Sequence, residues 1–154
     1  MTDIFSKKGS GHVSNEATTR ENEEKRIDVV NAIVIDDGRL LAMQRGFGSQ
    51  AGGWEFPGGK VEDGEDPEAA LVRSIGEKLD VPIEVNEFAF SVEVEHDGIA
   101  MHTRSYLCHI PQGKHPHLQE HTAARWLERE SLHNVGWLPS DARIVEVIVE
   151  RGIL

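Results

Sequence analysis

The chain has 154 residues, of which 38% are hydrophobic and 28% are charged, and its formal net charge is −11. This length suits one domain with enough residues to bury a core, and the composition is typical of a globular protein rather than a disordered one. The negative charge argues against a binding surface for duplex nucleic acid or for an anionic membrane. It leaves room for a small phosphate ligand, because metal ions bridge acidic side chains to phosphates.

The single cysteine, Cys108, excludes a disulfide bond within the chain and fits a reducing compartment, so we expect a cytoplasmic protein. No apolar run has the length that a bilayer requires, and the N-terminus lacks the apolar core of a signal peptide. Residues 1–26 are polar and charged and have the composition of a flexible tail. We therefore expect one folded domain at residues 27–154, as a monomer or a homodimer.

The first expected elements are two strands joined by a tight turn. A β-branched run at 27–35 predicts a strand, and Asp37-Gly38 after it is typical of a hairpin turn. A second strand is expected over 39–45. Residues 46–60 are rich in glycine and predict a loop.

A helix is expected next. Asp66 suits the N-cap, Pro67 suits the first helical position, and Pro82 stops the helix. Three apolar residues spaced by four would face the core: Leu71, Ile75 and Leu79.

The second half of the domain predicts more strands and a C-terminal helix. Two strands at 83–95 and 99–110 are joined by a second hairpin turn, Asp97-Gly98. After a polar loop, the remaining elements are a strand at 123–127, a helical turn at 128–133 and a helix at 140–151. We expect Ser140 or Asp141 to cap that last helix. This order predicts an α/β fold in which helices cover a mixed sheet.

The segment 58–81 follows a recognisable spacing of glycine, acidic, basic and aliphatic residues. Six positions match the spacing: Gly59, Glu65, Arg73, Ile75, Glu77 and Val81. With the lead-in Gly53-Trp54-Glu55-Phe56-Pro57-Gly58, the segment resembles the Nudix box of MutT-like Nudix hydrolases. The resemblance extends over residues 27–152. It implies the Nudix fold, a mixed β-sheet sandwiched between helices, and an enzyme that cleaves a nucleoside triphosphate to a monophosphate and pyrophosphate with Mg²⁺ or Mn²⁺.

The residue types in the box suit that chemistry. Cleavage of a pyrophosphate requires neutralised charge on the phosphate oxygens and a deprotonated water, and a hard divalent cation with oxygen ligands supplies both. The resemblance points to metal binding by the Gly59 carbonyl and by the carboxylates of Glu77 and Glu120. Arg73 and Glu77 lie at i and i+4 of the predicted helix, so the arginine can orient the acid.

Three positions depart from the family pattern. Ser74 stands where the resemblance implies a glutamate that acts as general base, Lys78 replaces the second acid of a metal-binding pair, and Asp80 replaces a glycine. Losing a general base typically costs about 10²–10⁴-fold in rate. Lys78 removes a ligand and brings a positive charge, which either bends away from the metal or touches a phosphate. Asp80 is a mild change, because aspartate tolerates the left-handed conformation of a helix end.

Several side chains are candidates for substitute roles. Glu65, Glu120 and His121 are possible replacements for the general base, and the sequence does not choose between them. Arg45 and Lys60 are expected to contact the phosphates of the nucleotide.

Two acids are expected to recognise the base of the nucleotide. Glu55 and Asp141 fall where MutT-like relatives read the base edge, and a carboxylate there accepts hydrogen bonds from amino or ring N–H groups. This predicts a cytosine or an oxidised guanine ring as the base.

Each candidate also has a structural explanation. Arg73 and Glu77 form an exposed ion pair in that explanation, Glu120 is a solvated loop acid, and Asp141 is only a helix cap. Three histidines whose spacing fits no closed zinc site are expected to be solvated: His115, His117 and His121. Two functions follow: a Nudix hydrolase with reduced activity, or a catalytically lapsed domain that binds a nucleotide or a partner.

Overall fold

The computed structural model describes residues 26–154 of the chain. The predicted tail at residues 1–26 lies outside this range except for Arg26, which opens the first strand. The elements in chain order are β1 (Arg26–Asp36), β2 (Arg39–Arg45), β3 (Trp54–Glu55), β4 (Gly58–Lys60), α2 (Pro67–Leu79), β5 (Glu84–His96), β6 (Ile99–His109), β7 (His121–Leu127), the 3₁₀ turn η1 (Arg129–Ser131) and α3 (Pro139–Glu150).

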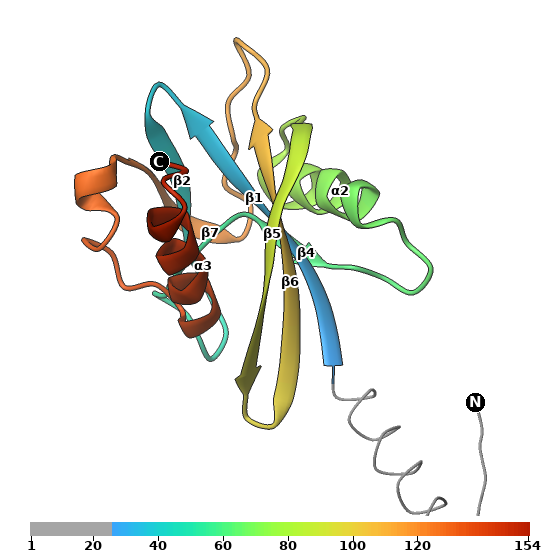
Figure 1. Cartoon of the computed structure of the whole chain (residues 1–154). Coiled ribbons are helices and arrows are strands. Elements are labelled where there is room, and N and C mark those ends of the chain that lie inside the picture. The colour runs from blue at the N-terminus through green and yellow to red at the C-terminus, as the bar shows by residue number, and fades with distance from the viewer. Residues whose placement is uncertain (1–25) are drawn as a thin grey trace, which may run out of the picture.

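The strands form one mixed sheet, which confirms the predicted α/β class. Its order is β3-β2-β1-β6-β5, and β4 and β7 pair with β1 and β2. β1 runs parallel to β6, and the other pairs of strands are antiparallel. Figure 1 shows α2 and α3 on opposite sides of this sheet. No helix within residues 26–154 is both long and apolar enough to cross a membrane.

Alternation along β1 builds two hydrophobic cores. Val30, Ala32 and Val34 belong to the core that includes Leu71 of α2. Ile33 points the other way and joins the core that includes the apolar face of α3. Successive residues of a strand point to opposite faces of a sheet, so one β-branched strand can support both layers.

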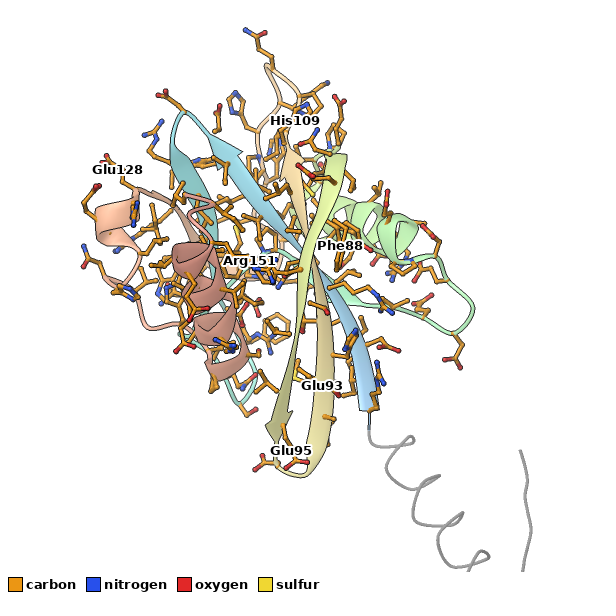
Figure 2. The ribbon with its side chains drawn as sticks, viewed as in Figure 1. Phe88, Glu93, Glu95, His109, Glu128 and Arg151 are labelled. Carbon is orange, nitrogen blue, oxygen red and sulfur yellow. The ribbon has the colours of Figure 1, made fainter. Side chains whose placement is uncertain are left out.

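Both predicted hairpins are confirmed, and their turns explain the Asp-Gly pairs. Asp37 and Gly38 have φ angles of 53° and 73°, and Asp97 and Gly98 have φ angles of 53° and 77°. Two residues with positive φ match the twist of a two-residue hairpin turn. The second hairpin carries Glu93 and Glu95 on the far part of β5 (Figure 2).

The helix α2 follows the prediction closely. The carboxylate of Asp66 accepts a hydrogen bond from the Ala69 amide at 3.1 Å, and Pro67 is the first helical residue. Leu71, Ile75 and Leu79 are buried. Asp80 has φ 49° and its amide donates to the Gly76 carbonyl, so this aspartate takes the left-handed position for which the family pattern has glycine.

The cap predicted for α3 is wrong. The helix begins at Pro139 after Leu138, and no side chain forms a cap hydrogen bond there. Asp141 instead accepts a hydrogen bond from the backbone amide of Phe56, on the segment between β3 and β4. Past its C-terminal end, Arg151 donates to the Ala89 carbonyl of β5 at 3.4 Å (Figure 2).

The glycine-rich segment 46–60, which was predicted to be a loop, contains the two short strands β3 and β4. β3 pairs with β2, and β4 pairs with β1 through Val29, Val30 and Asn31. These pairings hold the segment against the sheet and place it beside the first turn of α3.

Candidate functional site

A cavity of about 220 Å³ lies between β1, the segment from β3 to β4, and the start of α3. We call the part around Arg45, Glu55 and Asp141 the acidic end. We call the part around Gly58, Gly59, Lys60 and Lys78 the lysine end. Apolar side chains complete the walls: Val29, Val94, Met101, Leu138 and Ile144. Residues of both ends line the same cavity, so the two ends belong to one continuous space.

Asp141 is the most deeply buried acid of the cavity, with 8% of its surface exposed. Its Oδ1 accepts from the Phe56 amide at 3.0 Å. Burial raises the pKa of Asp141 to about 7, and the nearby negative charge of Glu55 adds to the rise, whereas the Phe56 amide opposes it. Near neutral pH this side chain therefore exists both as a neutral acid, which can donate a hydrogen bond, and as a carboxylate.

Glu55, in contrast to Asp141, has a lowered pKa. Its Oε1 accepts from Arg45 at 2.7 Å, and its Oε2 lies 2.8 Å from Nε2 of His121. Burial alone would raise the pKa of Glu55, but the hydrogen bonds and charges of His121 and Arg45 outweigh it and lower the pKa. The acidic end thus holds one ionised acid beside one acid that is partly neutral. Titratable pairs pushed apart in this way are common at functional sites.

His121 is not solvated as predicted. Its side chain is 5% exposed and is held by Glu55, and it lies in β7 directly opposite Arg45 of β2. Arg45 and His121 therefore approach Glu55 together. This cluster positions Glu55 and neutralises it.

The lysine end depends on close contact between β4, which we call the glycine strand, and α2. A side chain at Gly58 would overlap the carbonyl of Val30, and a side chain at Gly59 would overlap the hydroxyl of Ser74. Ser74 is 2% exposed. The Nζ atom of Lys78 donates to the Gly58 carbonyl at 2.9 Å. The last turn of α2 therefore places the Lys78 ammonium at the edge of the cavity.

Arg73 ties the following loop to α2. Its Nε donates to Glu65 Oε2 at 2.7 Å, and its NH2 group donates to Glu65 Oε1 and to the Lys60 carbonyl, both at 3.0 Å. Its NH1 group donates to Glu77 Oε1 at 3.0 Å. Arg73 lowers the pKa of Glu65 by hydrogen bonding, and the Glu62 amide adds to this effect. Both oxygens of Glu65 are thus engaged, which favours a structural role for this acid over the role of a base.

The predicted metal site does not fit these residues. Within residues 26–154, no three or more His, Cys, Asp or Glu side chains gather so that they could hold a metal ion. The Glu77 carboxylate accepts a hydrogen bond from Arg73. Glu120 is exposed, and it lines neither the cavity nor the hollow beside it that Arg73 and Glu77 line. A cation held near Gly59 would meet the ammonium of Lys78, and at about 5 Å each pair of unit charges repels by roughly 3 kcal/mol. Within the described residues, the protein therefore offers no complete set of acidic side chains for a divalent ion of its own at this loop.

The structure brings most predicted residues together. Arg45, Glu55, Gly59, Lys60 and Asp141 line one cavity. Arg73 and Glu77 line a shallow hollow beside it, which shares Gly59, Lys60 and Lys78 with the cavity.

Sequence reasoning missed Asn31 as a cavity residue. It is 4% exposed and accepts from the Ser105 hydroxyl at 2.7 Å. An asparagine within the β-branched run of β1 was the available signal, because a buried polar side chain requires a specific partner.

Comparison with known proteins agrees with this geometry. The model of the NUDIX domain family matches residues 25–147. The CTP pyrophosphohydrolase of Escherichia coli is 38% identical over 128 residues, which cover 81% of this chain and 93% of that protein. The 8-oxo-dGTP diphosphatase of Proteus vulgaris is 36% identical over 77 residues, which cover 49% of this chain and 67% of that protein.

The fold is also that of solved relatives. The crystal structure of a MutT NUDIX hydrolase from Burkholderia pseudomallei matches with a TM-score of 0.70 and 27% identity, over 79% of this chain and 96% of that chain. The glycine strand, the helix with Arg73 and Glu77, and the mixed sheet all lie within the matched range. The chain belongs to the NUDIX domain family.

Proposed function

We propose that this protein is a nucleotide pyrophosphohydrolase that cleaves a nucleoside triphosphate to a monophosphate and pyrophosphate. The observation that carries the proposal is the single cavity that joins the acidic end to the lysine end. A base with N–H groups suits the acidic end, and a chain of phosphates suits the lysine end. The names of the two relatives, which act on CTP and on 8-oxo-dGTP, support the same class of substrate.

The acidic end would select the base through Asp141. As a neutral acid, its carboxyl offers one donor and one acceptor, which match the ring nitrogen and the amino group of cytosine. As a carboxylate, it accepts from the ring N–H and the amino group of an oxidised guanine. The pKa of about 7 makes both states accessible at neutral pH. Cytosine and oxidised guanine therefore remain the two expected bases, and pH distinguishes them.

The phosphates would cross from the cavity into the hollow over Gly59, Lys60 and Lys78, which line both. At this hollow the side chain of Glu77 is exposed to solvent, and one of its carboxylate oxygens accepts a hydrogen bond from Arg73. We propose that Glu77 orients the attacking water. The water oxygen joins the α-phosphorus and its proton passes to solvent. The bond between the α-phosphorus and the bridging oxygen breaks, and pyrophosphate leaves with that oxygen.

Nudix hydrolases generally use divalent metal ions. The part of the chain that the structure describes gathers no complete set of acidic side chains for such an ion at the glycine strand. We therefore propose that Mg²⁺ or Mn²⁺ arrives as part of the substrate. Nucleoside triphosphates bind Mg²⁺ through their own phosphates, and the ion needs only one or two protein carboxylates in addition.

Pyrophosphate release tests the proposal. CTP, dCTP, dGTP and 8-oxo-dGTP are each incubated with Mg²⁺ or Mn²⁺ and either the natural protein or the Ser74→Glu/Lys78→Glu variant. We expect slow release by the natural protein and an increase of about 10²–10⁴-fold in the variant, because a general base is restored. Lys114→Glu is the matched control for Lys78→Glu, since it makes the same charge change in an exposed loop. Because Ser74 is buried, Lys78→Glu alone is assayed in parallel and the folding of each variant is checked by its Tm.

A second candidate is a nucleotide-binding domain without turnover. Lys78 and Ser74 stand where the family pattern has acids. Lys78 is held by its hydrogen bond to Gly58 and Ser74 is buried, and both observations favour this candidate. No turnover of any nucleotide by the natural protein, with turnover gained in the variant, would establish this candidate. Equal turnover in both proteins would keep the hydrolase and show that its base lies elsewhere than position 74.

A further inference from the structure

Lys78 carries a positive charge to a place where the sequence predicted a metal ion. It lies in the last turn of α2 and spans to β4, where its ammonium donates to the Gly58 carbonyl at 2.9 Å. Its ammonium approaches Gly59 as well, since a side chain there would stand 3.4 Å from Nζ. Lys78 lines both the cavity and the hollow.

Lys78 has no acidic partner among the residues that the structure describes. Within residues 26–154, Lys78 forms no ion pair, and its hydrogen bond is to a neutral carbonyl. The three other cations around the cavity and hollow differ: Arg45 pairs with Glu55, Arg73 pairs with Glu65 and Glu77, and Lys60 is exposed. An ammonium carries three donors, so the bond to Gly58 leaves two for a ligand. An ammonium fixed in this way at the edge of a cavity favours an anionic ligand there.

We propose that the Lys78 ammonium takes the place of a protein-held metal ion and binds the phosphates of the nucleotide directly, so that nucleotide binding does not require a divalent cation. This inference rests on the proposed function, because it takes the ligand to be a nucleotide. The lysine neutralises one phosphate charge with two hydrogen bonds, and the Gly58 carbonyl fixes its position. The family pattern places an acid at position 78, which repels phosphate unless a metal ion lies between them.

A structural role for Lys78 makes a different prediction. If the lysine only holds β4 against α2, its hydrogen bond to Gly58 matters and its charge does not. Lys78→Gln separates the two roles, because a glutamine amide can donate to the same carbonyl without carrying a charge. Lys78→Glu removes the cation and restores the acid of the family pattern. Lys114→Gln is the matched control for loss of a lysine from an exposed position.

The test is calorimetric titration with the α,β-methylene analogues of CTP and 8-oxo-dGTP, which resist cleavage. Each protein is titrated in EDTA and in Mg²⁺, and its Tm is measured without ligand. We expect the natural protein and Lys114→Gln to bind one analogue in EDTA. Lys78→Gln should keep its Tm but bind roughly 10–100-fold more weakly in EDTA, since a hydrogen bond to a charged group contributes about 1.5–3 kcal/mol. Lys78→Glu should bind only in Mg²⁺.

Two results would overturn the inference and leave the proposed function standing. The first is binding by the natural protein in Mg²⁺ but not in EDTA. The second is Lys78→Gln binding in EDTA as tightly as the natural protein, which would show that Lys78 only holds β4. If the natural protein binds neither analogue, whether in EDTA or in Mg²⁺, the nucleotide site itself is overturned, and the inference with it.

Discussion

The two ends of the cavity hold charge in different ways. At the acidic end, Glu55 is clasped by Arg45 from β2 and His121 from β7, while Asp141 is buried against the Phe56 amide. At the lysine end, Lys78 of α2 donates to a backbone carbonyl and forms no ion pair with any acid among residues 26–154. The acidic end matches what the family pattern implies, whereas the lysine end departs from it. Recognition of the base and handling of the phosphates can therefore be disturbed separately, by different substitutions.

The largest expected effect concerns Asp141 and pH. Its folded-state pKa of about 7 lies above the ordinary value of 3.8, so between these values the folded state binds the proton more tightly than the unfolded state does. The stability that Asp141 contributes is full below pH 4 and is lost as pH rises through 7. Asp141→Asn keeps an acceptor for the Phe56 amide and has no charge to bury. Chemical unfolding should show the natural protein losing stability against Asp141→Asn as pH rises from 4 to 8, by at most about 4 kcal/mol.

A pH-independent difference between these two proteins would contradict the burial of an ionisable Asp141. The same substitution sharpens the choice of base. If the base is cytosine, binding by the natural protein should be strongest below pH 7, where Asp141 can donate; for an oxidised guanine, binding should be strongest above it. Asp141→Asn should remove either trend.

A smaller effect is expected from Glu55→Gln. The glutamine amide carries no charge, so Arg45 and His121 both lose their charged partner. We expect binding of the nucleotide analogue to weaken by about 10–100-fold, in line with a charged hydrogen bond of about 1.5–3 kcal/mol. Inorganic triphosphate, which has no base, should bind unchanged. Glu95→Gln, on the exposed part of β5, is the matched control. Equal weakening of both ligands would mean that the two ends are not independent.

The smallest expected effect comes from the contact between Gly59 and Ser74. Gly59→Ala forces a methyl group against the Ser74 hydroxyl, and such overpacking typically costs about 1–3 kcal/mol of the free energy of unfolding. Ser74→Ala in the same protein removes the hydroxyl and should recover part of that loss. Urea unfolding of the two single variants and the double variant measures the coupling. Additive effects would show that Gly59 and Ser74 do not touch.

The sequence predicted local features well, because neighbouring residues determine them. The Asp66 cap, the Asp37-Gly38 turn and the buried face of α2 follow from spacing and turn chemistry alone. The cap of α3 was wrong because Asp141 bonds a backbone amide 85 positions away. His121 was expected in solvent because its partner, Glu55, lies 66 positions earlier in the chain. Contacts of this kind depend on how the strands pair, which a single sequence does not state.

Lys78 shows the same limit at a closer range. The sequence shows directly that Lys78 stands in the box, and it allows the side chain either to bend away from the metal or to touch a phosphate. A lysine has several rotatable bonds, so the sequence could not select a direction. In the structure, the hydrogen bond to the Gly58 carbonyl of β4 fixes the direction of the lysine side chain.

In the proposed function, one cavity holds the base at its acidic end and the phosphates at its lysine end. Amide chemical shifts of ¹⁵N-labelled protein test this directly, with nucleoside, inorganic triphosphate and the uncleaved triphosphate analogue added in turn. We expect nucleoside to shift the Phe56 amide, triphosphate to shift the Gly59 and Lys60 amides, and the analogue to shift all three. Shifts that gather instead at the loop around Gln112 and His115, or an analogue that moves only one end, would contradict it.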